Sequence, residues 1–188
     1  MTVLEQPCTI IEFDQFRSRP ENKNRLLELI DGEIVEKMPT EQHGVIALNI
    51  GSELRAYAKR YNTGRAGVEV RHRSAQDDRN SRLPDVSFRN TTHGPIVEQG
   101  SVVGMPDLAV EIKSPSDTIT EMRETALYYL ANGSRLVWLV YPHLRLIEVC
   151  RTNADIDILD EDQILSGHDV LPGFELAVAD VFADAFPE

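Results

Sequence analysis

Apolar side chains recur at helical spacing in two long segments of the chain. They follow the i, i+3, i+4 pattern over residues 41–61 and again over residues 119–131, which predicts two amphipathic helices. Thr40 stands where an N-cap would begin the first helix, and Ser116 or Asp117 can cap the second. The two helices divide the rest of the chain into groups of strands.

Three strands are predicted between the helices, at residues 68–73, 83–88 and 108–113. After the second helix, residues 136–141 form a continuous apolar run, which is typical of a strand buried on both faces. Residues 144–151 follow as its expected neighbour. Because strand–helix–strand crossovers join parallel strands with a right-handed connection, the strands at 108–113 and 136–141 are expected to form a parallel pair.

A β-hairpin is predicted near the N-terminus, where residues 26–30 and 33–37 are joined by Asp31-Gly32. Glycine tolerates positive φ, so Asp-Gly between two apolar runs is a strong signal for a two-residue hairpin turn. The hairpin precedes the first long helix and is therefore an addition to the main sheet.

The order of elements is helix, three strands, helix, two strands, which predicts an α/β fold of the α+β type with a mixed sheet. Gly64 and Gly67 are expected to break the chain before the first core strand. Shorter elements are expected at residues 11–17, 156–159, 174–176 and 178–186, the last three forming a C-terminal extension. We expect residues 1–188 to form one domain with its core at about residues 41–151.

Composition places the chain among globular proteins. It has 188 residues, of which 41% are hydrophobic, and no apolar stretch approaches the roughly 20 residues that span a membrane. The first six residues have neither a basic region nor an apolar core, so no signal peptide is expected. Cys8 and Cys150 lack metal-like spacing and are interpreted as free thiols in a reducing cytoplasm.

Two carboxylates and one ammonium stand out on the predicted strands. Pro84-Asp85 lies on one strand and Glu111-Ile112-Lys113 on the next, with Glu111 and Lys113 on the same face. Charged side chains inside an apolar strand are costly to bury unless they are paired or bind a metal. Asp85 and Glu111 are suited to Mg²⁺, and Lys113 to orienting a water or neutralising a phosphate. The alternative is an exposed edge strand that carries a Glu–Lys pair.

These pieces resemble the PD-(D/E)XK nuclease signature, and the chain as a whole resembles the Uma2-type endonuclease family within that superfamily. The resemblance extends from about Phe13 to Phe182. The matching pieces are Glu28-Leu29-Ile30-Asp31-Gly32-Glu33-Ile34-Val35-Glu36, Met38-Pro39 with His43, Leu83-Pro84-Asp85-Val86-Ser87-Phe88, Pro106-Asp107-Leu108-Ala109-Val110-Glu111-Ile112-Lys113-Ser114-Pro115-Ser116, Tyr129 with Gly133, Val137-Trp138-Leu139-Val140-Tyr141-Pro142, and Leu171-Pro172-Gly173.

The chain departs from the family pattern at two places, and it keeps a signature lysine that many members lack. The family often has a lysine near the position of Thr125, where this chain offers only Arg123 nearby. It usually has Asp-Pro where this chain has Tyr141-Pro142. Many members lack a lysine at the position of Lys113. The lysine here favours an intact site, whereas the missing helix lysine weakens the case for phosphate contacts from that helix.

The resemblance implies a restriction-endonuclease-like core and a DNA endonuclease that depends on Mg²⁺ or Mn²⁺. Asp85, Glu111 and the backbone carbonyl of Ile112 would bind the metal, and Lys113 would position the attacking water. Two further family positions are possible additions to the site, namely Glu33 and His43. The resemblance also implies a homodimer, for which the N-terminal hairpin offers an edge.

The net charge of −12 is unusual for a protein that binds DNA, because DNA affinity comes largely from Lys and Arg on phosphates. Basic residues gather between positions 55 and 89, and Arg71, Arg73 and Arg82 approach the proposed site in sequence. They are candidates for nucleic-acid contacts, and the alternative is a solvated face that balances the acids. The acidic total argues against tight, nonspecific binding of long duplexes.

Two hypotheses follow. In the first, the protein is a metal-dependent endonuclease that uses Asp85, Glu111 and Lys113. In the second, it is a nuclease fold that serves as a binding or assembly module with little or no catalysis. The acidic charge and the missing helix lysine favour the second hypothesis. The complete set of three residues favours the first, which we prefer.

Overall fold

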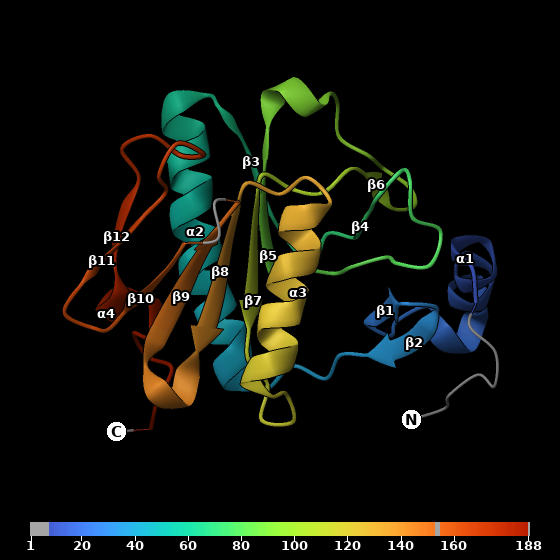
Figure 1. Cartoon of the computed structure of the whole chain (residues 1–188), viewed down its shortest axis with the longest axis horizontal. Helices are drawn as coiled ribbons and strands as arrows, with labels where there is room; N and C mark the ends of the chain where they lie inside the picture. The colour runs from blue at the N-terminus through green and yellow to red at the C-terminus, as the bar shows by residue number, and fades with distance from the viewer. Residues whose placement is uncertain (1–7, 153–154, 188) are drawn as a thin grey trace.

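A six-stranded mixed sheet forms the centre of the molecule (Figure 1). The computed structural model describes residues 8–152 and 155–187. Spatial order in the sheet is β10-β9-β8-β7-β5-β3. The strands are β3 (Gly64–Val68), β5 (Val86–Asn90), β7 (Leu108–Ile112), β8 (Leu136–Tyr141), β9 (Leu146–Arg151) and β10 (Ile156–Leu159).

Helices cover both faces of this sheet. Helix α2 (Glu41–Tyr61) lies on one face and α3 (Ile119–Ala131) on the other (Figure 1). Strands β7 and β8 are parallel and joined through α3, with Glu111 opposite Leu139, whereas the other neighbours in the sheet are antiparallel. The predicted order of helix, three strands, helix and two strands is therefore confirmed, as is the parallel pair.

Strand β8 separates two apolar cores. Trp138 and Val140 pack into the larger core, which α2 and the C-terminal elements cover. Val137 and Leu139 pack on the opposite face with residues of α3. All six residues of β8 are buried, so the prediction of a strand buried on both faces is correct. The two cores hold the strands that carry the candidate site in a rigid frame.

The N-terminal hairpin forms a small sheet beside the main one (Figure 1). Strands β1 (Leu27–Ile30) and β2 (Glu33–Glu36) are joined by Asp31 and Gly32, whose φ angles of 51° and 88° fit the predicted two-residue turn. A third apolar cluster lies between the hairpin and the first helix. Its buried members are Cys8, Ile10, Phe13, Leu27 and Leu29. The preceding elements are α1 (Ile10–Ser18) and the 3-10 turn η1 (Pro20–Asn22).

The first core strand begins earlier than predicted. Gly64 and Gly67 lie inside β3 and do not break the chain. A Cβ at Gly64 would come within 2.4 Å of both the Arg89 carbonyl oxygen and the Phe88 ring, so glycine permits the close approach of β3 to β5. The predicted strand at 68–73 is replaced by the end of β3 and the two-residue β4 (His72–Arg73), which pairs with β6 (Val102–Val103).

The C-terminal extension also differs in detail. Strand β12 (Glu175–Ala177) pairs with β11 (Ile164–Ser166), which was not predicted. The last helix, α4 (Val178–Val181), is much shorter than the expected helix at 178–186. Helix α3 is capped by Thr118 in a capping box with Glu121, so the prediction of Ser116 or Asp117 as the cap was wrong. The remaining 3-10 turns are η2 (Thr91–His93) and η3 (Pro142–Leu144).

Cys8 and Cys150 are buried free thiols, as predicted. Across the part of the chain that the structure describes, no helix combines the length and the hydrophobicity needed to cross a bilayer. The expectation that the first six residues are not a signal peptide falls on residues that lie outside the described part of the chain. The single-domain organisation of residues 1–188 stays a prediction.

We predict that stability falls as the pH drops from 6.5 to 4. Burial lowers the pKa of His72 from 6.5 to about 4, although its contact with the Gly104 carbonyl opposes this shift. Between these two pH values the His72 side chain is therefore protonated in the unfolded chain and neutral in the folded chain. The full loss is about 3 kcal/mol. Urea unfolding across this range would measure it. His72→Asn should show a smaller decline, and parallel declines in both proteins would refute the assignment to His72.

Candidate active site

The fold brings Asp85 and Glu111 together at one end of the central sheet. Asp85 directly precedes β5, and its backbone N–H donates to the Val110 carbonyl, 3.0 Å away. Glu111 lies on β7, where alternation directs Val110 and Ile112 into the α2 core and Glu111 to the face covered by α3. Both carboxylates are buried, with side chains 2% and 9% exposed. The antiparallel pairing of β5 with β7 is what makes them neighbours.

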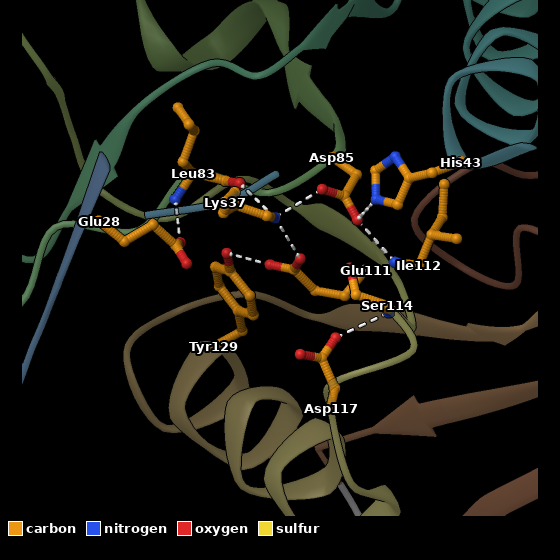
Figure 2. A network of polar contacts seen from close by, with 10 residues as sticks. All are labelled: Glu28, Lys37, His43, Leu83, Asp85, Glu111, Ile112, Ser114, Asp117 and Tyr129. Carbon is orange, nitrogen blue, oxygen red and sulfur yellow. Dashed lines mark hydrogen bonds and ion pairs between the residues drawn. The ribbon is translucent and has the colours of Figure 1, made fainter. Parts of the chain in front are cut away.

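A lysine that the sequence analysis did not select lies between the two carboxylates. Lys37 follows β2, and its Nζ donates to Asp85 Oδ1 at 2.5 Å and to Glu111 Oε2 at 3.1 Å (Figure 2). The same nitrogen donates to the Leu83 carbonyl at 3.1 Å. One oxygen of each carboxylate therefore points to a single position.

The other oxygen of each carboxylate is held by the scaffold (Figure 2). Asp85 Oδ2 accepts the backbone N–H of Ile112 at 2.6 Å and contacts His43 Nε2 at 3.0 Å. Glu111 Oε1 accepts the hydroxyl of Tyr129 from α3 at 2.7 Å. Each carboxylate thus has one anchored oxygen and one oxygen directed at Lys37, which fixes their relative orientation.

A third carboxylate, Glu28, belongs to the same environment. It is buried on β1, and its Oε1 accepts the backbone N–H of Leu83 at 2.6 Å. A glutamate inside the apolar strand Leu27–Ile30 was the available sequence signal, although it was quoted only as part of a family motif. Glu28 therefore fixes the chain that leads into Asp85, two residues further on.

Burial and mutual charge perturb the acid–base properties of these groups. Burial raises the pKa of Asp85, but the Lys37 ammonium and His43 outweigh it, so the pKa lies below its ordinary value. Burial also raises the pKa of Glu111, to about 8, because Asp85 and Glu28 add to the effect of burial while Lys37 opposes it. The three nearby carboxylates hold the pKa of Lys37 well above its ordinary value despite burial. The cluster formed by Glu28, Lys37, Asp85 and Glu111 therefore carries more carboxylates than cations.

Two of the predicted site residues lie away from this cluster. Lys113 follows the end of β7, and its Nζ donates to the Ser114 carbonyl at 3.0 Å. No hydrogen bond or ion pair joins it to Asp85 or Glu111 within the described residues. Glu33 is exposed at the start of β2. Of the two additional candidates, only His43 contacts the cluster.

The arginines proposed for nucleic-acid contacts do not form an exposed basic surface. Arg71 is 7% exposed with its guanidinium over the Phe13 ring, and Arg82 is 6% exposed and lies over the Tyr128 ring at 4.4 Å. Arg73 is half-buried on β4. Arg123, near the missing helix lysine, forms a two-pronged ion pair with Glu148. Burial therefore withdraws Arg71 and Arg82 from solvent, whereas the charge of Arg123 is paired with Glu148.

A cleft of about 840 Å³ opens onto the cluster between the hairpin and the start of α3. Its carboxylate side chains outnumber its lysines and arginines nine to two. The basic members are Lys37 and Arg82, and His43 also lines the wall. The acidic members are Glu28, Asp31, Glu36, Glu69, Asp85, Glu111, Asp117, Glu121 and Glu124. Such a cleft repels phosphate and attracts cations.

Comparison with protein families identifies the chain. A family model described as "Uma2: Putative restriction endonuclease" matches residues 12–179. The chain belongs to the Uma2 family. The match covers the N-terminal hairpin, the central sheet and most of the C-terminal extension, so the resemblance found in the sequence motifs is confirmed.

A solved structure supports the same relationship for this Uma2 protein. It is similar to a protein from Anabaena variabilis described as a putative nuclease belonging to DUF820, with 25% identity and a TM-score of 0.81. The likeness covers 96% of this chain and 100% of the other. It confirms the predicted mixed α/β fold of the nuclease type. A search of curated proteins found no match.

Restriction-endonuclease-like families generally use divalent metal ions, and the donor set of this Uma2 chain fits one. Mg²⁺ commonly takes only one or two protein carboxylates and completes its shell with water and phosphate oxygens. Asp85 and Glu111 each direct one oxygen to the same position. The described residues contain no group of three His, Cys, Asp or Glu side chains arranged to hold a metal. A cation here would therefore depend on water or substrate for most of its ligands.

Replacing Tyr129 with phenylalanine should destabilise the fold by about 2 kcal/mol, because it removes a buried hydrogen bond and leaves a buried oxygen of Glu111 without its donor. Tyr128→Phe is the matched control. Its hydroxyl donates to Asp77 at 2.9 Å in a half-buried setting, and its loss should cost about 1 kcal/mol or less. Urea unfolding of the three proteins at pH 7 gives both differences. Equal losses of unfolding free energy in the two variants would show that the contact with Glu111 stabilises the fold no more than the contact with Asp77 does.

Proposed function

We propose that this protein is an endonuclease that hydrolyses DNA phosphodiester bonds with Mg²⁺ or Mn²⁺ held by Asp85 and Glu111. The observation that carries the proposal is the convergence of Asp85 Oδ1 and Glu111 Oε2 on one position in an open cleft. Family membership and the likeness to a protein described as a putative nuclease support the same chemistry. The Ile112 carbonyl is a further candidate ligand.

The chain's own residues orient the two carboxylates for this role. Ile112 N–H and His43 hold one oxygen of Asp85, and Tyr129 holds one oxygen of Glu111. The other oxygen of each carboxylate, which accepts from Lys37, is left for a cation to bind. This preorganisation avoids rearrangement of the ligands during the reaction. A divalent cation bound there would supply positive charge against the negative charge that develops on phosphate oxygens.

The proposed reaction is hydrolysis by direct displacement at phosphorus. The oxygen of a water molecule forms a bond to phosphorus while the bond from phosphorus to the leaving sugar oxygen breaks. The water releases one proton to solvent, and the leaving oxygen takes up one proton from solvent. No oxidant, reductant or further reactant is needed.

Because the cleft is acidic, the proposed activity depends on the cation for binding DNA as well as for hydrolysing it. Nine carboxylates face two basic side chains there, so a phosphate would be repelled until a cation reduces the charge. DNA binding without divalent metal should therefore be weak. This behaviour differs from that of proteins with basic grooves, which bind DNA without metal.

The second candidate function is a binding or assembly module with little catalysis. It is favoured by the acidic cleft and by the position of Lys113 outside the cluster. The two functions make opposite predictions for metal binding and DNA cleavage, which one experiment separates.

Titration of Mn²⁺ into the wild type followed by incubation with supercoiled plasmid tests the nuclease proposal. Asp85→Asn should weaken Mn²⁺ binding at least about tenfold and nicking at least about a hundredfold, because it removes a ligand charge. Asp107→Asn is the matched control. Asp107 also follows a proline, but it accepts the Asn90 N–H at 2.8 Å and pairs with His93 away from the cluster. Its variant should nick like the wild type.

Wild-type protein that neither binds Mn²⁺ nor nicks plasmid would reject the nuclease proposal and favour the binding module. Equal losses in the Asp85 and Asp107 variants would point instead to a general effect on folding. Circular dichroism of each variant separates that case from a specific loss.

We further predict a homodimer that pairs through the N-terminal hairpin, and a cytoplasmic location. Strand β2 pairs only with β1 among the described residues, so its other edge offers unpaired backbone groups. Light scattering at working concentration should then give about twice the chain mass of 21.2 kDa. A mass near that of one chain would contradict the dimer.

A further inference from the structure

We propose that Lys37, and not Lys113, supplies the catalytic ammonium of this site, so that the N-terminal hairpin contributes a catalytic residue. This inference rests on the proposed nuclease function. The family signature directs attention to Lys113 because it lies two residues after Glu111. The contacts in the folded chain direct it to Lys37 instead.

Geometry distinguishes the two lysines clearly. Lys37 Nζ contacts an oxygen of Asp85 and an oxygen of Glu111 and lines the cleft, with a side chain 20% exposed (Figure 2). Lys113 Nζ donates to the carbonyl of the next residue and is absent from the cleft lining. Only Lys37 can therefore contact a water or phosphate that approaches the two carboxylates.

The position of Lys37 is built into the hairpin. Its backbone N–H donates to the Leu26 carbonyl at 2.8 Å, directly beyond the last pair of the hairpin. The preceding residue, Glu36, forms a two-pronged ion pair with Arg25 at 2.9 and 2.6 Å. On the other side of β1, Leu29 exchanges two backbone hydrogen bonds with Ser81, which ties the hairpin to the segment leading to Asp85. These contacts leave the Lys37 side chain directed at the cluster.

The chemistry of an ammonium suits this place. It has three N–H donors, which here are directed to Leu83, Asp85 and Glu111. In the proposed reaction, Lys37 would yield the two carboxylate oxygens to the cation, keep its contact with the Leu83 carbonyl, and donate to the attacking water or to a phosphate oxygen. It would thereby orient the nucleophile and stabilise the negative charge that develops in the transition state.

Plasmid nicking at saturating Mn²⁺ tests the assignment with five proteins. They are the wild type, Lys37→Met, Lys37→Gln, Lys113→Met and Lys59→Met, the last a control on the exposed surface of α2. Lys37→Met keeps the length of the side chain and removes the charge. Lys37→Gln also keeps an N–H donor, which protects the fold if the methionine variant is unstable.

Both Lys37 variants should lower kcat at least about a hundredfold with KM changed less than about threefold, because the lost contact acts in the transition state. Mn²⁺ should bind Lys37→Met at least as tightly as the wild type, because no ammonium competes for the two oxygens. Lys113→Met and Lys59→Met should stay within about threefold of the wild type in both measurements.

Three results would overturn the assignment. Wild-type nicking that survives in Lys37→Gln but is lost in Lys113→Met would return the role to Lys113 and leave the nuclease function intact. A wild type that does not nick DNA would reject the nuclease function and this inference with it. Weaker Mn²⁺ binding by a folded Lys37 variant would show that the lysine supports the carboxylates and does not act on the substrate.

Discussion

The ion pairs of Lys37 with Asp85 and Glu111 are the constraint on which the candidate site depends. Two carboxylates at 2% and 9% exposure would repel each other strongly without a cation between them. Lys37 supplies that cation and connects the N-terminal hairpin to the entrance of β5 and to β7. Removing one partner from such a group is expected to be strongly destabilising, because the remaining charge stays buried. The same ion pairs therefore fix the geometry of the site and attach the hairpin to the central sheet.

Local patterns in the sequence predicted much of the frame around this site. The bounds of α2, α3 and β8 agree with prediction because helical periodicity and a continuous apolar run are encoded over many neighbouring residues. The start of β3 was missed because glycines usually interrupt strands, whereas Gly64 is needed where the Phe88 ring and the Arg89 carbonyl come close. That requirement arises only when distant segments pack together. Strand β11 was missed for the same reason, since its three residues pair with β12 and carry little pattern of their own.

The site shows the same division between local and long-range information. Asp85 and Glu111 were identifiable because a charge inside an apolar strand requires an explanation, and the structure brings the two together. Lys37 was not identified, because its partners lie 48 and 74 residues away and depend on how the hairpin folds against the sheet. Arg71, Arg73 and Arg82 stay candidates for nucleic-acid contacts. A charge count does not reveal that Arg71 and Arg82 are buried over aromatic rings, or that Arg82 lines the cleft.

The hairpin is more than an addition to the central sheet, because it forms part of the acidic cleft. The family match begins at residue 12, so it includes the hairpin as well as the central sheet. In the cleft, the hairpin segment contributes Glu28, Glu36 and Lys37, and hence both part of the negative charge and one of the two basic side chains. A phosphate entering this cleft would find favourable charge only near Lys37, Arg82 and a bound cation. If the proposed function is correct, charge therefore restricts a bound phosphodiester to the position where the two carboxylates converge. The hairpin helps to define this position because it supplies Lys37.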